Sequence, residues 1–264
     1  MKKAINKFLV SGFALLVFSG FSSAAPATVY QAAGPDAASI QSTVDQFRAA
    51  LGGANNGNTP GPLAGGRREI NWDGGGSTAT SLGSTPFDVF LNSRGNRSIT
   101  PGTGFVQAPA AGLADVFGNS SYATIFKPFS QARLFSPIGS NITDTVFFVP
   151  GVQNIPATTR GFGVVFSDVD LPNGSGHGNK RGNRHSRTLI QYYDAAGHLL
   201  FRSYAPASPG DGNQTFFGVV FDDARIASVR ITAGATPGPD DTQRLDVVMM
   251  DDFIYGEPQA LQYY

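Results

Sequence analysis

The chain has 264 residues, of which 33 are glycine, 17 are proline and 21 are phenylalanine, and it contains no cysteine. This composition excludes a disulfide-stapled scaffold and is typical of a turn-rich β-protein that is stabilised by its own core. The 19 basic and 19 acidic residues balance, which argues against a general binder of nucleic acid or of anionic membranes.

The first 24 residues have the pattern of a secretory signal peptide. Three lysines precede an apolar run over residues 8–18, and small residues at 22–24 form a cleavage site. We therefore predict export, either secreted or periplasmic, with cleavage near Ala24. The mature chain would then carry 16 basic and 19 acidic residues, a net charge of −3. No other apolar run approaches the roughly 18 residues that a membrane span needs, so we expect none.

Residues 25–65 are expected to form a leader, one helix and a loop. Residues 25–35 are rich in alanine, proline and glycine, as in a flexible leader. Asp36 is a good N-cap, and Gly52 ends the apolar pattern that follows it. We predict an amphipathic helix over residues 37–51. Its apolar residues, at helical spacing, are Ile40, Val44, Phe47 and Leu51.

Short apolar segments separated by glycine and proline fill residues 66–258. About a dozen strands with one helix predict an antiparallel β-sandwich of jelly-roll type, followed by a tail over residues 259–264. The loop at 194–197 ends in glycine and predicts a hairpin between the strands on either side of it. The expected strands span residues 66–74, 87–91, 105–107, 124–126, 133–136, 144–149, 160–169, 188–193, 198–204, 215–221, 226–232 and 245–255.

The last expected strand carries two adjacent carboxylates, Asp251 and Asp252, within an apolar run. Side chains alternate between the two faces of a strand, so one of the two should point to the buried face. We favour Asp251 as the buried one. A buried carboxylate needs an ion pair, hydrogen bonds or a metal ion, because leaving it bare is costly.

The sequence GRREINWDG at residues 66–74 offers two kinds of partner, provided that it pairs with the last strand. In one interpretation Arg67 or Arg68 forms an ion pair with one aspartate, and the other aspartate faces solvent. In the other, carboxylate and amide oxygens hold a structural calcium ion, which prefers such ligands. The carboxylates of that predicted metal site are Glu69, Asp73, Asp251 and Asp252.

Four segments together carry a resemblance to a family: residues 66–74, 135–150, 161–170 and 247–255. Over residues 36–258 the chain resembles an uncharacterised family of exported bacterial proteins related to proteins with a C-terminal PEP-CTERM sorting tail. The family has no established activity. This chain stops at Tyr264 without the tail, so we expect a soluble product that is not anchored by that route.

The two ends of the predicted sandwich are also similar to calcium-stabilised jelly-roll carbohydrate-binding modules. The matching features are an acidic residue in the first strand, Glu69, and two aspartates before an aromatic residue in the last strand. This resemblance implies that the first and last strands pair and share one calcium ion, bound by Glu69 and by Asp251 or Asp252.

We expect a non-catalytic protein that binds a glycan or another surface polymer. Trp72, Tyr192 and Tyr193 are the candidate ligand-binding residues, because aromatic faces stack on sugars; core packing is the alternative for Trp72. A polysaccharide hydrolase or lyase that uses two carboxylates and a structural matrix protein are the alternative functions. No Ser–His–Asp arrangement is evident, so no catalytic residue is assigned. The basic residues between 172 and 187 predict a solvated hairpin loop, with binding of an anionic sugar or phosphate as the alternative.

Overall fold

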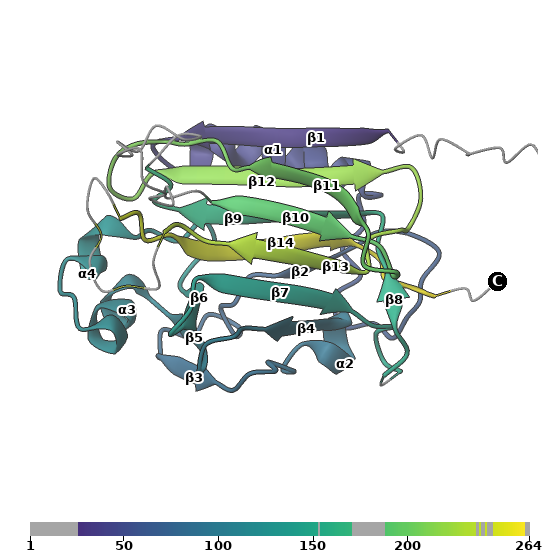
Figure 1. Ribbon diagram of the computed structural model, residues 1–264, viewed down its shortest axis with the longest axis horizontal. Helices are drawn as coiled ribbons and strands as arrows, with labels where there is room; N and C mark the ends of the chain where they lie inside the picture. The colour runs from purple at the N-terminus through teal and green to yellow at the C-terminus, as the bar shows by residue number, and fades with distance from the viewer. Residues whose placement is uncertain are drawn as a thin grey trace, which may run out of the picture.

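The computed structural model describes residues 26–152, 154–170, 188–235, 238, 241 and 245–261. Two antiparallel sheets pack face to face, and short helices lie at the back and at one end (Figure 1). The expected signal peptide and the basic segment 172–187 lie outside the described residues. None of the helices within the described ranges has the length and hydrophobicity needed to cross a membrane.

The larger sheet has the strand order β1-β12-β9-β14-β6-β5-β3, and β2 pairs with the second half of β14 beyond the end of β6. The last strand of this sheet in the sequence, β14, therefore lies in its middle. The strands are β1 (Ala27–Gly34), β2 (Arg67–Ile70), β3 (Ser81–Gly83), β5 (Gly104–Ala108), β6 (Leu134–Ile138), β9 (Gly161–Ser167), β12 (Gln214–Phe221) and β14 (Met249–Gly256).

The smaller sheet has the order β11-β10-β13-β7-β4, and β8 and β15 form a separate two-stranded pair. Its strands are β4 (Asn96–Ile99), β7 (Ile142–Phe147), β10 (Leu189–Tyr193), β11 (Leu199–Tyr204) and β13 (Ser228–Thr232); the extra pair is β8 (Ala157–Thr158) and β15 (Gln259–Ala260). The helices are α1 (Ala37–Ala50), α2 (Leu91–Arg94), α3 (Ala110–Phe117) and α4 (Tyr122–Ile125).

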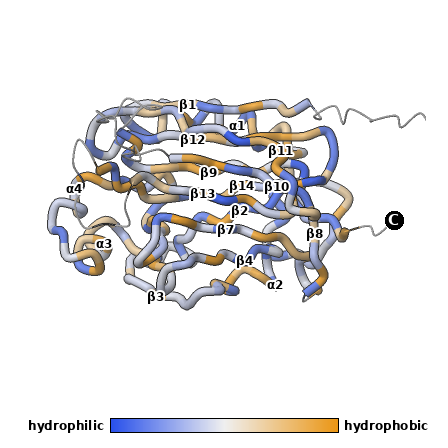
Figure 2. Tube along the Cα trace, viewed as in Figure 1, coloured by the Kyte–Doolittle hydropathy of each residue, from blue (hydrophilic) through white to orange (hydrophobic). Residues whose placement is uncertain are grey.

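The main core lies between the two sheets, and the outer face of the larger sheet is covered as well. Helix α1 packs on one part of that face, and α3 with α4 packs on another. Strands β9, β12 and β14 are therefore buried at every position. Their near-continuous apolar sequences match this two-sided burial, and Figure 2 shows the hydrophobic stretch along β9.

Helix α1 begins where its sequence predicts. The Asp36 side chain accepts a hydrogen bond from the Ser39 backbone N–H, and the Ser39 side chain reaches back to Asp36, which completes a capping box. Phe47 packs its ring over Gly163 of β9 and Gly218 of β12, where a Cβ atom would come within 2.8 and 2.7 Å of that ring. The two glycines therefore let the helix approach the sheet closely.

The antiparallel β-sandwich and the N-terminal helix are confirmed, and the differences are local. Residues 27–34, expected as a leader, form β1, because they pair along their whole length with β12. Residues 259–260, expected in a tail, form β15 against β8. Two expected strands are wrong: residues 122–125 form α4, and the segment 87–91 runs into α2. Helix α3 was not predicted.

Candidate metal centre and polar pocket

Asp251 and Asp252 occupy a β-bulge in the middle of β14. In the ladder with β9, Met250 pairs with Phe166 and Phe253 with Val164, so two residues of β14 lie opposite one residue of β9. Met250 and Phe253 consequently both face the main core. The two aspartates between them both lie toward the outer face of the sheet, and both are buried. The expectation that only one would be buried is wrong, because strict alternation fails across a bulge.

The two carboxylates have different partners. Asp251 Oδ2 accepts hydrogen bonds from the backbone N–H groups of Phe129, at 2.6 Å, and Ser130, at 3.3 Å. Asp252 Oδ1 accepts from the Ser130 hydroxyl at 2.6 Å, and its Oδ2 lies 3.4 Å from Arg48 Nη2. The cation beside the pair is therefore Arg48 of α1. The ion pair expected with Arg67 or Arg68 does not form.

Arg67 and Arg68 have other carboxylate partners. Arg68 is fully buried and makes a two-point ion pair with Glu257, with Nε–Oε2 at 2.6 Å and Nη2–Oε1 at 2.7 Å. Arg67 bonds Glu69, which also accepts from Arg48 at 3.1 and 2.9 Å. Both carboxylate oxygens of Glu69 are thus engaged by guanidinium groups.

The fourth expected metal ligand, Asp73, is also buried near the aspartate pair. Its Oδ1 accepts from the Arg133 backbone N–H at 2.8 Å, and its Oδ2 has no hydrogen-bond partner among the described residues. Strand β2, which was expected to be the first strand, pairs with β14 as expected, with Ile254 opposite Glu69. However, the four expected ligands do not converge on one point closely enough to form a metal-binding group in the described part of the chain.

Burial is the largest cause of the raised pKa values of Asp251 and Asp252. It raises the pKa of Asp251 well above its ordinary value, and the neighbouring charge of Asp252 adds to the rise. Burial also raises the pKa of Asp252, to about 6, against the opposing effects of the Ser130 hydroxyl and the Arg48 cation. The pKa of Asp251 is thus raised by burial and by its neighbour, and Asp252 exchanges its proton near pH 6.

A polar pocket of about 260 Å³ opens beside this pair. Residues from α1, β2 and its following turn, α2 and β14 line it, together with the loops around residues 55 and 130. Two of its lining residues are arginines and two are carboxylates. The full lining is Arg48, Asn55, Glu69, Asn71, Arg94, Ser130 and Asp252.

Two of the three aromatic residues expected to bind a ligand are in the core. Trp72 is fully buried, stacks on Phe135 with ring centroids 3.6 Å apart, and donates from Nε1 to the Asp251 carbonyl. Tyr192 is fully buried and donates to the Phe162 carbonyl. The stacking role is wrong for these two, because neither ring reaches the surface; the core alternative for Trp72 is confirmed.

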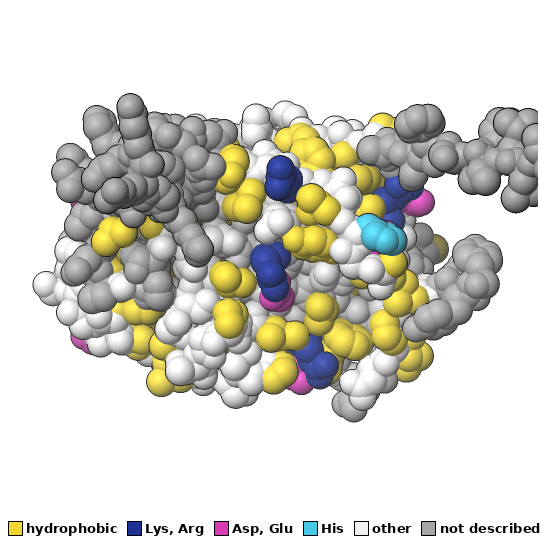
Figure 3. All heavy atoms as spheres, viewed as in Figure 1, with side chains coloured by type: hydrophobic (Ala, Val, Ile, Leu, Met, Phe, Trp, Pro, Cys, Tyr) yellow, Lys and Arg dark blue, Asp and Glu magenta, His cyan; other side chains and the backbone are white. Residues whose placement is uncertain are grey.

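Tyr193 alternates with Tyr192 and lies on the outer face of the smaller sheet. It is half-buried, and its hydroxyl accepts a hydrogen bond from Gln191 at 2.8 Å. Figure 3 shows this face, with basic and acidic side chains set among scattered hydrophobic ones. Arg230 and Asp144 form a two-point ion pair there, with both distances at 2.7 Å.

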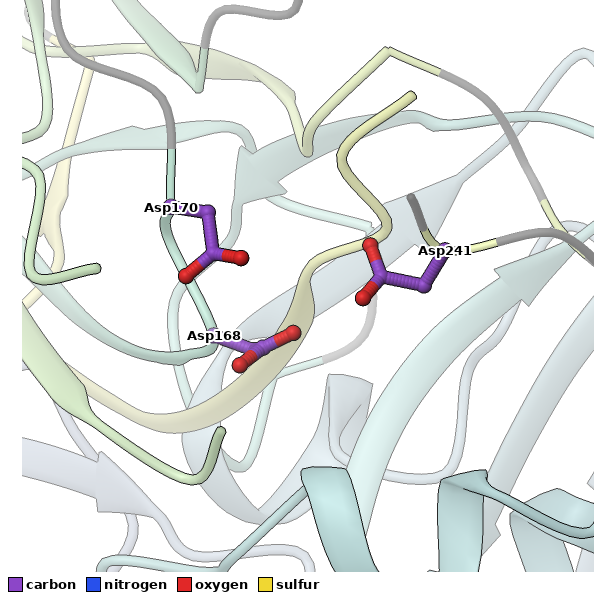
Figure 4. A group of neighbouring side chains, drawn as sticks. All are labelled: Asp168, Asp170 and Asp241. Atoms are coloured by element: carbon purple, nitrogen blue, oxygen red, sulfur yellow. The ribbon is translucent and has the colours of Figure 1, made fainter. Parts of the chain in front are cut away.

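A different acidic group has the geometry of a metal site. Asp168, Asp170 and Asp241 each offer a carboxylate oxygen, and these oxygens all lie within 4.8 Å of one another (Figure 4). Asp168 and Asp170 follow β9, and Asp241 precedes β14. Asp170 also accepts from the Gly210 backbone N–H at 2.9 Å, in the loop before β12. The group therefore lies where three neighbouring strands of the larger sheet meet.

Asp168 is the buried residue of this group, and its carboxylate lacks hydrogen bonds of normal geometry. Its backbone is left-handed, with φ at 73°, and its side chain is fully buried. The backbone N–H of Gly212 acts on this carboxylate, but neither oxygen makes a hydrogen bond of normal geometry with the described residues. Burial raises the pKa of Asp168 to about 8, and the negative charge of the neighbouring aspartates adds to the rise. Buried polar groups in proteins nearly always have a hydrogen-bond partner or a bound ion, so we expect one at this carboxylate.

The sequence offered little to single out this group. Asp168 and Asp170 are two residues apart at the end of a strand, but Asp241 is distant in the chain and adjacent to another aspartate. Only the antiparallel pairing of β9 with β14 brings these segments together.

Comparison with known proteins gives no match: no family model, no curated protein and no solved structure is similar to this chain. Fold and site therefore define a class only, an antiparallel β-sandwich with a group of three aspartates, one of them buried, at the ends of neighbouring strands. The family resemblances of the sequence stay expectations.

Proposed function

We propose that the protein is an exported, calcium-stabilised β-sandwich that binds a glycan or another surface polymer. The group Asp168, Asp170 and Asp241 supports the proposed calcium site. Asp168 is fully buried there, and its carboxylate lacks hydrogen bonds of normal geometry with the described residues. A cation there would supply the partner that Asp168 lacks. Its charge would also offset the repulsion between three carboxylates.

The donor chemistry favours calcium. All ligands offered are oxygen atoms, which suit hard cations and not the softer metals that prefer histidine and cysteine. Calcium accepts an irregular set of six to eight oxygens, including backbone carbonyls, whereas magnesium demands a near-ideal octahedron. A site built from loop segments at strand ends fits the first description.

Calcium binding should stabilise the folded state. A ligand that binds only the folded form at a hundredfold excess over its Kd adds about 2.7 kcal/mol to the free energy of unfolding. We expect a higher melting temperature in calcium than in chelator for the wild type. We expect Asp168→Asn to abolish this difference, because it removes the central carboxylate.

The control is Asp115→Asn, which removes an exposed carboxylate on α3 and should respond to calcium as the wild type does. Thermal melts of the three proteins, with and without calcium, are sufficient. Equal wild-type melting temperatures in calcium and chelator would contradict the metal site. So would a full calcium response in the Asp168 variant.

Two features support the binding role. One is the exposed face of the smaller sheet, which carries Tyr193 and arginines such as Arg230, and the other is the polar pocket. A glycan-array screen of the purified protein, with and without calcium, tests it. Binding to a defined set of glycans supports the proposal, and a blank array in both conditions would argue for a structural role instead.

Glycoside hydrolysis is the second candidate. Asp252, with its pKa raised to about 6, and Glu69 line the same pocket, as a general acid and a second carboxylate must. Against it, both oxygens of Glu69 are held by arginines. Release of reducing ends from a polysaccharide panel, lost in both Asp252→Asn and Glu69→Gln, would establish this activity.

A further inference from the structure

The polar pocket contains two arginines in opposite situations. Arg48 is surrounded by carboxylates: Asp45 at 3.1 Å, Glu69 at 2.9 Å and Asp252 at 3.4 Å. Arg94, at the end of α2, forms no ion pair with a carboxylate of the described residues, although the charge of Glu69 acts on it. Its Nε and Nη1 atoms are buried and have no hydrogen-bond partner among the described residues.

The surroundings of Arg94 disfavour its positive charge, which a bound anion would offset. Burial lowers the pKa of Arg94, and the nearby Arg68 cation adds to the lowering. Arg68 already uses its own carboxylate, Glu257, in a two-point pair. The Arg94 guanidinium lines the pocket, and a guanidinium is suited to a planar carboxylate, which it can bind at two points.

The rest of the lining is suited to hydroxyl groups. Asn55, Asn71 and Ser130 offer neutral donors and acceptors, and Glu69 and Asp252 offer acceptors. A volume of about 260 Å³ is at the small end for a ligand site and is of the size of one sugar ring. The two carboxylates in the lining disfavour a doubly charged anion such as phosphate.

We infer that the polar pocket binds a hydroxylated monocarboxylate, the chemistry of a uronic-acid residue, with its carboxylate on Arg94 and its hydroxyls on the asparagines. This inference deepens the glycan-binding part of the proposed function by naming an acidic sugar. It does not depend on the metal centre, which lies at other residues.

Calorimetric titration of the full chain with four probes tests the inference. Galacturonate is the expected ligand, galactose is its neutral match, acetate is a bare carboxylate, and inorganic phosphate is a different anion. We expect galacturonate to bind about tenfold or more tightly than any of the other three. A galacturonate trimer then distinguishes the source: tighter binding than the monomer indicates a polymer, and equal binding indicates a free or terminal acid.

Variants locate the site. Arg94→Gln should weaken galacturonate binding by about tenfold or more, because it removes the cation that faces the carboxylate. Arg94→Lys, which keeps the charge, should retain part of the affinity. Arg225→Gln changes an arginine that pairs with Asp223 in the loop between β12 and β13 and does not line the pocket, so it serves as the matched control with unchanged binding. Circular dichroism confirms that each variant is folded.

Three outcomes would overturn the inference. One is the absence of galacturonate binding at millimolar concentration by the wild type. Another is equal affinity for galacturonate and galactose, or tighter binding of phosphate. The third is unchanged galacturonate binding by a folded Arg94→Gln. The thermal melts in calcium test Asp168 and not Arg94. A negative galacturonate result therefore does not contradict the metal site, and a negative calcium result does not contradict galacturonate binding.

Discussion

Asp168, Asp251 and Asp252 are all buried carboxylates, and the neighbours of each one decide its chemistry. Asp251 accepts hydrogen bonds from the backbone N–H groups of Phe129 and Ser130, and burial raises its pKa well above the ordinary value. Asp252 accepts from the Ser130 hydroxyl, lies 3.4 Å from the Arg48 guanidinium and titrates near pH 6. Neither oxygen of Asp168 makes a hydrogen bond of normal geometry with the described residues. The same residue type thus serves three different purposes within one sheet.

The titration of Asp252 gives a prediction for stability. Its pKa rises from 3.8 in the unfolded chain to about 6 in the fold. Between these values the folded state holds a proton that the unfolded state has lost, so this group makes stability fall as the pH rises from about 4 to 6. Asp252→Asn, which resembles the protonated form, should remove this part of the pH dependence.

Urea unfolding of wild type and variant at pH 4 and pH 7 measures the effect. A shift of one pKa unit corresponds to about 1.4 kcal/mol, so the variant should gain on the order of 2–3 kcal/mol relative to the wild type between the two pH values. Parallel pH profiles would show that Asp252 ionises freely in the fold and would contradict the prediction. Asp115→Asn is again a suitable control.

At the residue scale, the sequence predicted that one aspartate of the last strand is buried, because the two interrupt an apolar run, whereas both are buried. It did not predict their partners. Arg48 comes from a helix about 200 positions away in the chain, and a register shift sends both side chains to one face. Neither fact is encoded in local spacing. The metal-like group at Asp168 was missed for the same reason.

Among the elements, α1 shows how a sequence pattern and a tertiary contact agree. Its helical spacing and capping residue were evident from the sequence, and Ile40, Val44 and Phe47 are the buried residues. Phe47 makes edge contacts with Tyr30 of β1 at 5.5 Å and with Phe216 of β12 at 5.2 Å. The helix is thereby attached to two strands at once.

Truncation of this contact should be costly. We expect Phe47→Ala to lower the free energy of unfolding by about 3–5 kcal/mol, as for other buried phenylalanines. Gln46→Ala, on the exposed side of the same helix, should change it by about 0.5 kcal/mol or less. Chemical denaturation of the two variants measures both. A Phe47→Ala cost as small as that of the control would mean that α1 does not stabilise the sandwich.

Strand β1 is an element that its own sequence pattern does not predict. Its residues are mostly small, and their alternation is too weak to predict a strand. They become a strand because the edge of β12 offers eight successive pairing positions. Conversely, the segment 122–125 contains residues that favour strands, but it forms a helical turn that packs against α3. In both cases tertiary contacts override local preference.

In the whole molecule, the Arg68–Glu257 pair joins distant segments. Arg68 also donates to the carbonyls of Gly57 at 2.8 Å and Thr59 at 2.7 Å, so one side chain holds β2, the preceding loop and the end of β14 together. Removing one partner of a fully buried pair leaves an uncompensated charge. We expect Arg68→Met to cost about 3–5 kcal/mol of unfolding free energy.

The double variant Arg68→Met with Glu257→Leu should lose less than the sum of the two single changes, because no charge is then left alone. Arg225→Met, which breaks an exposed pair with Asp223, is the control and should cost about 1 kcal/mol or less. Strict additivity of the two buried substitutions would show that the pair contributes no coupling.

The position of β14 has a consequence for the order in which the protein can form. The ribosome delivers this strand after every other strand of the larger sheet, yet it belongs between β9 on one side and β6 and β2 on the other. Until it arrives, a growing chain has two incomplete halves with open hydrogen-bonding edges and no strand to join them. The larger sheet can therefore be completed only after β14 has been synthesised, so a single late strand decides when its two halves become one sheet.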